Sequence, residues 1–276
     1  MPQSQKTVNF ALSIKGGLAR GLSGVGVLRF FQEEGLKPKL VAGSSAGAIL
    51  AGMYALGMKW YELVEELQKV NFRELISFKS FITGRSVVDE DKFIKRFSEF
   101  VNKDINIEDL PVKFVAFASD PNTRERVFID HGNLFRAIMC SCAYPVAFPS
   151  PIRMDNKVLV DGDLTQSYSA KELKAQYNID KVIGIRHFVN WSRPLKPTSG
   201  FIDEIIAIYR LIGGQIERFQ AHTDPADLEI AFNVDGQGYT SFNTIEKYAE
   251  KAYKATVAMR EQIFKLLNVK HHQHGK

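Results

Sequence analysis

One serine lies where it could act as a nucleophile. The segment Gly43-Ser44-Ser45-Ala46-Gly47 follows the apolar run 40–42 and opens a run of good helix formers, 46–56. Small residues there let the chain turn sharply from strand to helix and hold the central serine strained, with its hydroxyl projecting from the sheet. The pattern predicts Ser45 as the nucleophile, flanked by Gly43 and Gly47. Small residues are also common wherever a strand and a helix merely pack closely.

A second turn, 15–21, could stabilise an oxyanion. It follows a predicted strand, 7–14, and precedes a predicted helix, 22–34. Gly16 and Gly17 allow the main chain to approach a ligand and to point N–H groups into one concavity. The carboxyl ends of consecutive parallel strands share one edge of a sheet, so this turn can lie beside the serine. The glycines fit neither G-x-G-x-x-G nor a Gly-Lys-Ser/Thr loop, which argues against a nucleotide site.

A carboxylate completes the set of candidate groups. Two short predicted strands, 152–154 and 157–160, lead into Asp161-Gly162-Asp163. An apolar strand that ends in Asp-Gly places a carboxylate at the strand terminus in a tight turn. The same dipeptide also forms turns that have no catalytic role.

These three turns need a sheet to position them, and the chain alternates predicted strands and helices throughout. The alternation predicts an α/β fold with a largely parallel central sheet and helices on both faces. We expect one domain over 1–276, with the motifs in about 7–190 and a C-terminal helical part at about 200–270. Further strands are expected at 112–119, 126–129, 181–189 and 227–234, and helices at 59–70, 89–101, 134–143, 171–177, 201–220 and 244–269. Within 201–220, Gly213-Gly214 suggests close approach of another backbone.

Composition narrows the class of protein. The 276 residues are 45% hydrophobic and 24% charged, as in ordinary soluble globular proteins, and no uncharged apolar run reaches the length of a membrane span. The first residues lack the order of a signal peptide, so a cytoplasmic location is expected. A net charge of +5 suits contact with an anionic surface. No nucleic-acid-binding motif stands out, so nucleic acid is not an expected partner. Cys140 and Cys142 are expected to be buried and not to form a mutual disulfide.

Two further segments, 71–88 and 271–274, each allow a functional and a purely structural interpretation. Residues 71–88 interleave Phe72, Phe78 and Phe81 with basic residues, as in a flap over a site or a surface that touches lipid headgroups. Such stretches more often pack their aromatic side chains inward. The tail His271-His272-Gln273-His274 could bind a metal adventitiously, but its terminal position favours a disordered end.

The Gly-rich turn, the serine elbow and a strand-terminal Asp-Gly more than a hundred residues later resemble, in that order, the patatin-like phospholipase family. The resemblance continues through Gly24-Val25-Gly26-Val27-Leu28 and through the segment 141–149, and covers most of residues 8–185. The joint occurrence of the motifs is specific, although each motif alone is not.

This resemblance implies a three-layer fold and a serine acyl hydrolase that works with a Ser-Asp dyad. Ser45 would be the nucleophile and Asp161 the base that takes its proton. The backbone of 16–18 would form the oxyanion hole, with Arg20 as a buttress. A carboxylate is a weak base in water, but burial raises its proton affinity. The chemistry requires no metal and no organic cofactor.

Two positions depart from the family pattern. Leu18 stands where the family has a third glycine, so its N–H remains available only if the backbone there suits a residue with a Cβ. Asp163 stands where the family has glycine or alanine. Its carboxylate could raise the pKa of Asp161 by like-charge repulsion, or point to solvent and have no effect.

The sequence leaves two alternatives to the dyad. His187 follows Asp161 near the end of a strand, which fits the Ser, Asp, His order of a triad esterase, although such a histidine is more often structural. The departures at Leu18 and Asp163 could instead mark a weakly active or inactive protein that binds lipid or acyl chains. Our leading hypothesis is a hydrolase of lipid-like esters that contacts the inner membrane surface peripherally. Acyl-chain preference and oligomeric state stay open.

Overall fold

The computed structural model describes residues 6–77, 86–99, 101–149, 151–166, 168–190 and 200–269. The central part of the Phe-rich segment, 78–85, and the histidine-containing tail lie outside these residues. So does 191–199, which makes up most of the connection before the long helix at 201.

The sheet is built around β1 (Lys6–Ile14), because the side chains of Phe10 to Ile14 are buried on both of its faces. The described residues form an eight-stranded sheet in the order β5-β6-β3-β2-β1-β7-β8, and β4 also pairs with β3. The other strands are β2 (Leu36–Ser44), β3 (Lys113–Asp120), β4 (Glu125–Ile129), β5 (Ile152–Met154), β6 (Lys157–Asp161), β7 (Lys181–Phe188) and β8 (Leu228–Asn233).

The centre of the sheet is parallel and its β4–β6 part is antiparallel. β3, β2, β1, β7 and β8 pair in parallel, whereas β4 and β6 run antiparallel to β3. This confirms the predicted α/β class with a largely parallel sheet. β6 pairs with β3 only through Val160 and Asp161, so its last residue, Asp161, lies opposite Ala118 near the carboxyl end of β3. The antiparallel pairing thereby brings the Asp-Gly turn to the edge where the serine elbow lies.

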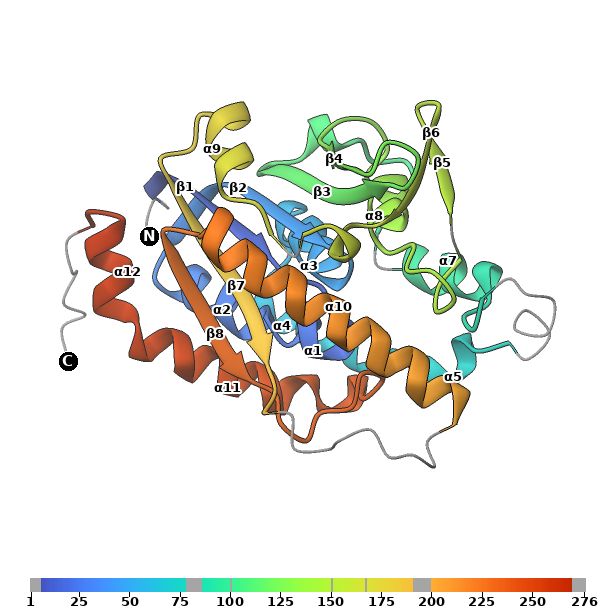
Figure 1. The fold of residues 1–276 in the computed structure, drawn as a ribbon. Coiled ribbons are helices and arrows are strands. Elements are labelled where there is room, and N and C mark those ends of the chain that lie inside the picture. Colours follow the sequence, from blue (N-terminus) through green and yellow to red (C-terminus); the bar gives the residue numbers. More distant parts are fainter. Residues whose placement is uncertain are drawn as a thin grey trace.

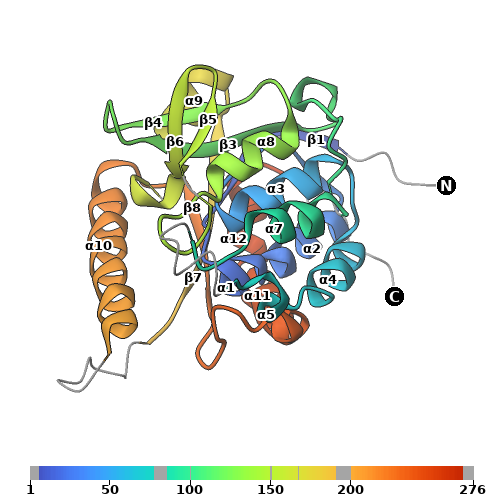
Figure 2. The ribbon, with the colours of Figure 1, turned by 90° about the vertical axis from the view of Figure 1, so that its right-hand side faces the viewer.

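Helices cover both faces of the sheet (Figures 1 and 2). Most of them lie behind the sheet in Figure 1, while α9 and α10 lie in front of it. Helices behind the sheet include α1 (Leu18–Leu22), α2 (Val25–Glu33), α3 (Ala46–Ala55), α4 (Trp60–Gln68) and α11 (Ile245–Ala258). The remaining helices are α5 (Phe72–Leu75), α7 (Glu90–Ser98), α8 (Leu134–Ser141), α9 (Lys171–Tyr177), α10 (Phe201–Thr223) and α12 (Arg260–Leu266).

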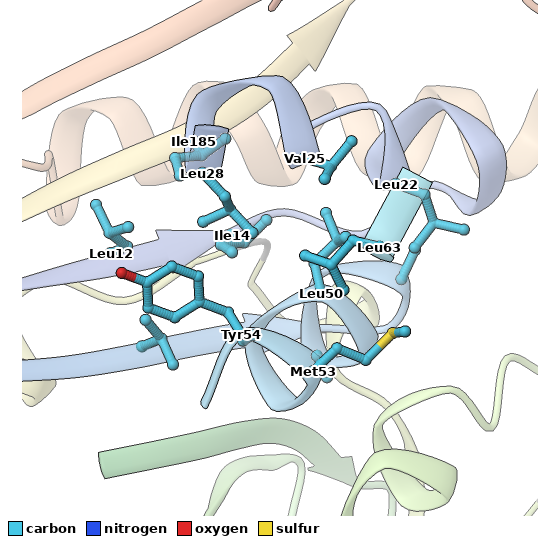
Figure 3. Close-up of a cluster of buried hydrophobic side chains, with 14 of the residues drawn as sticks. Leu12, Ile14, Leu22, Val25, Leu28, Leu50, Met53, Tyr54, Leu63 and Ile185 are labelled. Carbon is cyan, nitrogen blue, oxygen red and sulfur yellow. The ribbon is translucent and has the colours of Figure 1, made fainter. Parts of the chain in front are cut away.

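Alternate side chains of β1 enter two separate cores. Phe10, Leu12 and Ile14 belong to the larger core, whereas Ala11 belongs to a smaller one with Leu173 of α9. Figure 3 shows how residues of the larger core meet between the sheet and its helices. The side chains labelled there are Leu12, Ile14, Leu22, Val25, Leu28, Leu50, Met53, Tyr54, Leu63 and Ile185.

Several local expectations need correction. The helix predicted at 22–34 is preceded by the separate turn of α1, and the long helix predicted at 244–269 breaks at Met259 into α11 and α12. Gly213-Gly214 does not meet another backbone, because no described atom lies within 4 Å of a Cβ built at either residue. Cys140 and Cys142 are buried and free, as predicted.

α10 carries a row of exposed apolar side chains. Ile208, Leu211, Ile212 and Phe219 recur at helical spacing, and Phe219 is 71% exposed. Across the described residues, no helix combines the length and apolarity that crossing a bilayer requires.

Candidate active site

Ser45 occupies a strained backbone conformation between β2 and α3. Its φ of 52° and ψ of −124° are unusual for a residue with a Cβ, and such a geometry costs about 1–3 kcal/mol. The Ser45 N–H donates a hydrogen bond to the Ser141 Oγ at 2.9 Å, and that hydroxyl donates to the Phe117 carbonyl at 2.6 Å. Ser141 therefore ties the elbow to β3. Neither the residue type of Ser141 nor its position in the segment 141–149 predicted this role from the sequence.

The two glycines of the elbow lie where a side chain would not fit. A Cβ at Gly43 would overlap the backbone of Gly47, and a Cβ at Gly47 would overlap the carbonyl oxygen of Ile14. The turn therefore packs against the end of β1 through bare backbone. This close approach places the Gly-rich turn after β1 directly beside the serine.

Asp161 is fully buried at the end of β6. Its N–H donates to the Ala143 carbonyl at 3.0 Å and its carbonyl accepts from the Ser119 Oγ at 2.9 Å. The carboxylate Oδ1 accepts a hydrogen bond from the Asp163 N–H at 2.9 Å, whereas Oδ2 has no hydrogen-bond partner among the described residues.

Burial, reinforced by the nearby Asp163 charge, raises the pKa of Asp161 well above its ordinary value. The Asp163 N–H, which donates to Oδ1, and the nearby Ser45 hydroxyl oppose this rise in the pKa. The structure thus brings the predicted nucleophile and the predicted base together. Asp161 has an open carboxylate oxygen and an elevated proton affinity, which a general base needs.

The Gly-rich turn lies against this pair. A Cβ at Gly16 would lie 2.6 Å from the Ser45 Cβ and would overlap Oδ2 of Asp163. Gly17 and Leu18 both have positive φ, 119° and 52°. Leu18 therefore adopts a conformation that usually favours glycine. Among the described residues, no hydrogen bond uses the N–H groups of Gly17 or Leu18, which leaves both available as donors.

Arg20 holds the neighbouring segment in place. Its Nε donates to the Gln237 carbonyl at 2.7 Å, and its guanidinium carbon lies 3.9 Å from the centre of the Tyr239 ring. The Ala19 N–H also donates to the Tyr239 carbonyl, at 3.0 Å. Arg20 thus links α1 to the loop after β8, whose part in the site the sequence reasoning missed.

His187 lies on the other side of the turn. A Cβ at Gly17 would overlap the His187 ring, and burial, with smaller effects of Lys15 and Arg20, lowers the pKa of His187 well below its ordinary value. The ring is therefore neutral. Among the described contacts, none joins this ring to Ser45 or Asp161.

An apolar pocket of about 50 Å³ opens beside Ser45. Its walls come from α1, α3, α4, α5 and α7 and from three loops. The lining residues are Leu18, Leu22, Ser45, Ala46, Ile49, Leu67, Val70, Phe72, Leu75, Phe93, Arg96, Phe97, Cys142, Phe148 and Phe242. Phe72, from the Phe-rich segment, packs inward here and stacks with Phe242 at a ring-centre distance of 6.0 Å. The pocket could hold an apolar chain next to the serine.

The chain belongs to the patatin-like phospholipase family, because the model of that family matches residues 12–174. An uncharacterized NTE family protein of Mycobacterium tuberculosis is 28% identical over 155 residues, which cover 56% of this chain and 42% of that protein. Lysophospholipase NTE1 of Candida glabrata is 28% identical over 179 residues, 60% of this chain and 10% of the fungal protein. This chain therefore matches less than half the length of either relative.

A solved structure shows a related fold. VipD from Legionella pneumophila has a TM-score of 0.55 at 12% identity, and the match covers 94% of this chain and 67% of VipD. At this identity the likeness concerns the fold alone, and it agrees with the mixed α/β architecture described above.

Proposed function

We propose that this protein is a serine hydrolase of lipid-like acyl esters, of the phospholipase A or lysophospholipase type. The observation that carries the proposal is the open oxygen of the buried Asp161 carboxylate beside Ser45 on its strained elbow. Family membership supports hydrolysis of lipid esters, as does the similarity to lysophospholipase NTE1 of Candida glabrata.

The proposed reaction proceeds through an acyl-enzyme. Asp161 accepts the Ser45 hydroxyl proton while Oγ forms a bond to the ester carbonyl carbon. The resulting oxyanion accepts hydrogen bonds from the N–H groups of Gly17 and Leu18. Collapse breaks the ester C–O bond, and the leaving alkoxide takes the proton from Asp161. Water then repeats the sequence on the acyl-enzyme, with Asp161 again as the base, and releases the carboxylic acid.

The test of this proposal measures turnover and serine reactivity in the intact chain. The expected result is hydrolysis of short and long p-nitrophenyl esters and of phospholipid vesicles, together with covalent labelling of Ser45 by a fluorophosphonate. A folded protein that is silent on all of these substrates, and whose Ser45 resists the fluorophosphonate, would instead favour an acyl-binding role.

The pocket beside Ser45 predicts how a substitution can change the enzyme's preference for acyl-chain length. Ile49 lies one helical turn after Ser45 on α3 and lines the pocket, so the larger ring of Ile49→Phe should shorten the space for a chain. Each methylene excluded loses about 0.8 kcal/mol of transfer free energy, which is about fourfold in kcat/KM. Comparing kcat/KM over a series of p-nitrophenyl esters of increasing chain length measures this effect.

Ile49→Leu provides the matched control, since it keeps the volume of the side chain. We expect this control to follow the chain-length dependence of the wild type. An equal loss on short and long esters in Ile49→Phe would show that the pocket does not hold the acyl chain.

We also propose that α10 contacts the lipid surface through its exposed apolar row. Leu211 and Phe219 are 63% and 71% exposed, and their transfer into lipid is favourable by about 1.5–3 kcal/mol each. The protein's net charge of +5 adds attraction to anionic headgroups. Leu211→Ser/Phe219→Ser is therefore expected to weaken binding to anionic phospholipid vesicles by about tenfold or more in co-sedimentation.

Val257→Ser is the control for this prediction, because Val257 is an exposed apolar residue of a different helix, α11. Circular dichroism checks that both variants are folded. If the α10 variant and the α11 control bind vesicles equally well, α10 is not the lipid-contacting surface.

A further inference from the structure

A second carboxylate lies within the candidate active site. Asp163 follows Asp161 by two residues, and its Oδ2 lies against Gly16 in the Gly-rich turn. Its Oδ1 is buried and has no hydrogen-bond partner among the described residues. The side chain therefore points inward, toward the turn that also touches Ser45. Of the two orientations left open by the sequence, the structure shows the one in which Asp163 can act on Asp161.

A charge pair from two distant segments faces this carboxylate. Lys15, at the start of the Gly-rich turn, forms an ion pair with Glu217 of α10. The side chain of Lys15 is only 14% exposed, so water screens its charge weakly. Its positive charge lowers the pKa of Asp163, whereas Glu217 raises that pKa.

The other groups around the two carboxylates are neutral. Both Tyr144 and Cys142 face them, and burial raises the pKa of each, reinforced by the carboxylate charges. The nearby Ser44 hydroxyl and the Gly16 N–H lower the pKa of Asp163. Lys15 and Glu217 are therefore the charges, apart from Asp161 itself, that govern Asp163.

The balance of these effects determines the pH at which the Asp163 carboxyl loses its proton. Burial raises the pKa of Asp163 to about 6, even with Lys15 opposing the rise. Two neighbouring buried carboxylates do not lose their protons independently, because the charge of one increases the proton affinity of the other. The charge state of Asp163 therefore bears directly on how strongly Asp161 holds a proton.

We propose that Asp163 is a positioning residue that strengthens Asp161 as the base for Ser45, and that the Lys15–Glu217 pair sets the strength of this effect. The proposal rests on the function proposed above. Asp163 is one of the two positions at which this chain departs from the family pattern, and by this proposal that departure tunes the dyad. The proposal also gives α10 a direct electrostatic connection to the site, through Glu217.

Two single substitutions should shift the pH profile in the same direction by different amounts. Activity requires Asp161 deprotonated, so kcat/KM falls as the pH drops through the pKa of Asp161. Asp163→Asn removes the neighbouring charge and keeps the size of the side chain, so the acid limb should move to lower pH by about one unit. Lys15→Met removes the charge that favours ionised Asp163, so Asp163 is neutral over a wider pH range and Asp161 holds its proton less strongly. The acid limb should therefore also move to lower pH, by less than in Asp163→Asn.

A double variant shows whether Lys15 acts through Asp163. Lys15→Met/Asp163→Asn should have the acid limb of Asp163→Asn alone, because the carboxylate on which Lys15 acts is gone. Asp104→Asn removes an exposed carboxylate and is the control, with an acid limb expected at the wild-type position. A short, soluble p-nitrophenyl ester serves as substrate. An acid limb unchanged in Asp163→Asn, or moved to higher pH by Lys15→Met, would overturn the proposal.

A titration separates this proposal from the proposed function. The carboxyl carbons of the resting protein are followed by ¹³C NMR against pH, and the Asp161 signal is identified by its loss in Asp161→Asn. The Asp161 carbon should titrate at lower pH in Asp163→Asn than in the wild type, whether or not the protein hydrolyses esters. An unchanged Asp161 titration would reject the role of Asp163 even in an active enzyme. Absent turnover and absent Ser45 labelling would reject the hydrolase function alone.

Discussion

Replacement of Ser45 by alanine, or of Asp161 by asparagine, is expected to reduce ester hydrolysis by about 10⁴-fold or more. Ser45→Ala removes the atom that would form the acyl-enzyme. Asp161→Asn keeps the shape of the side chain but cannot accept the serine proton, so the base proposed for Ser45 is lost. The measurement is kcat/KM on a short p-nitrophenyl ester for each purified, folded variant.

His187→Ala distinguishes the dyad from a triad. Because the His187 ring lies against Gly17 and makes no described contact with Ser45 or Asp161, its removal should reduce turnover far less than either substitution above. Loss of turnover in His187→Ala equal to that in Asp161→Asn would favour a Ser-Asp-His esterase. Substantial hydrolysis by Ser45→Ala would remove Ser45 from the mechanism altogether.

Gly26→Ala is expected to lower the free energy of unfolding by about 1–3 kcal/mol or more. A Cβ at Gly26 of α2 would overlap the carbonyl oxygen of Ala249 in α11, so the two helices would have to separate. Their contact joins the motif-bearing part of the chain to its C-terminal part. Chemical denaturation measures the effect as a lower midpoint with an unchanged m-value.

Gly214→Ala is the matched control, since it makes the same substitution in a helix where no described atom lies within 4 Å of the new Cβ. Alanine favours helix over glycine by about 1 kcal/mol, so this variant should be somewhat more stable than the wild type. If both substitutions change the free energy of unfolding in the same direction, the contact between α2 and α11 is not as close as described.

The sequence predicted those parts of the fold that local patterns determine. The bounds of α9 and β5 coincide with the predicted 171–177 and 152–154, because charged helix formers and a two-residue turn mark them locally. The elbow at Ser45 and the turn at Gly16 could be found for the same reason. Each depends on small residues at fixed spacing between a strand and a helix.

The contacts that tune the site could not be predicted in this way. Ser141 and Gln237 are joined to Ser45 and Arg20 over sequence separations of 96 and 217 residues. The hydrophobic periodicity of the sequence does not indicate such pairs, because they form only once the strands have taken their order in the sheet. The open space beside Gly213-Gly214 could not be predicted either, since paired glycines in a helix indicate close packing only when another segment crosses there.

The central position of β1 in the sheet limits how far the chain can be truncated without loss of the fold. The family match, 12–174, includes all of β2 but only residues 12–14 of its neighbour β1, and it ends before β7, which pairs with the other edge of β1. A fragment limited to the match would present the hydrogen-bonding edge of a central strand to solvent and lack α11 over Gly26. We infer that such a fragment would self-associate through this open edge. A useful expression boundary therefore lies after α12, well beyond the last family motif.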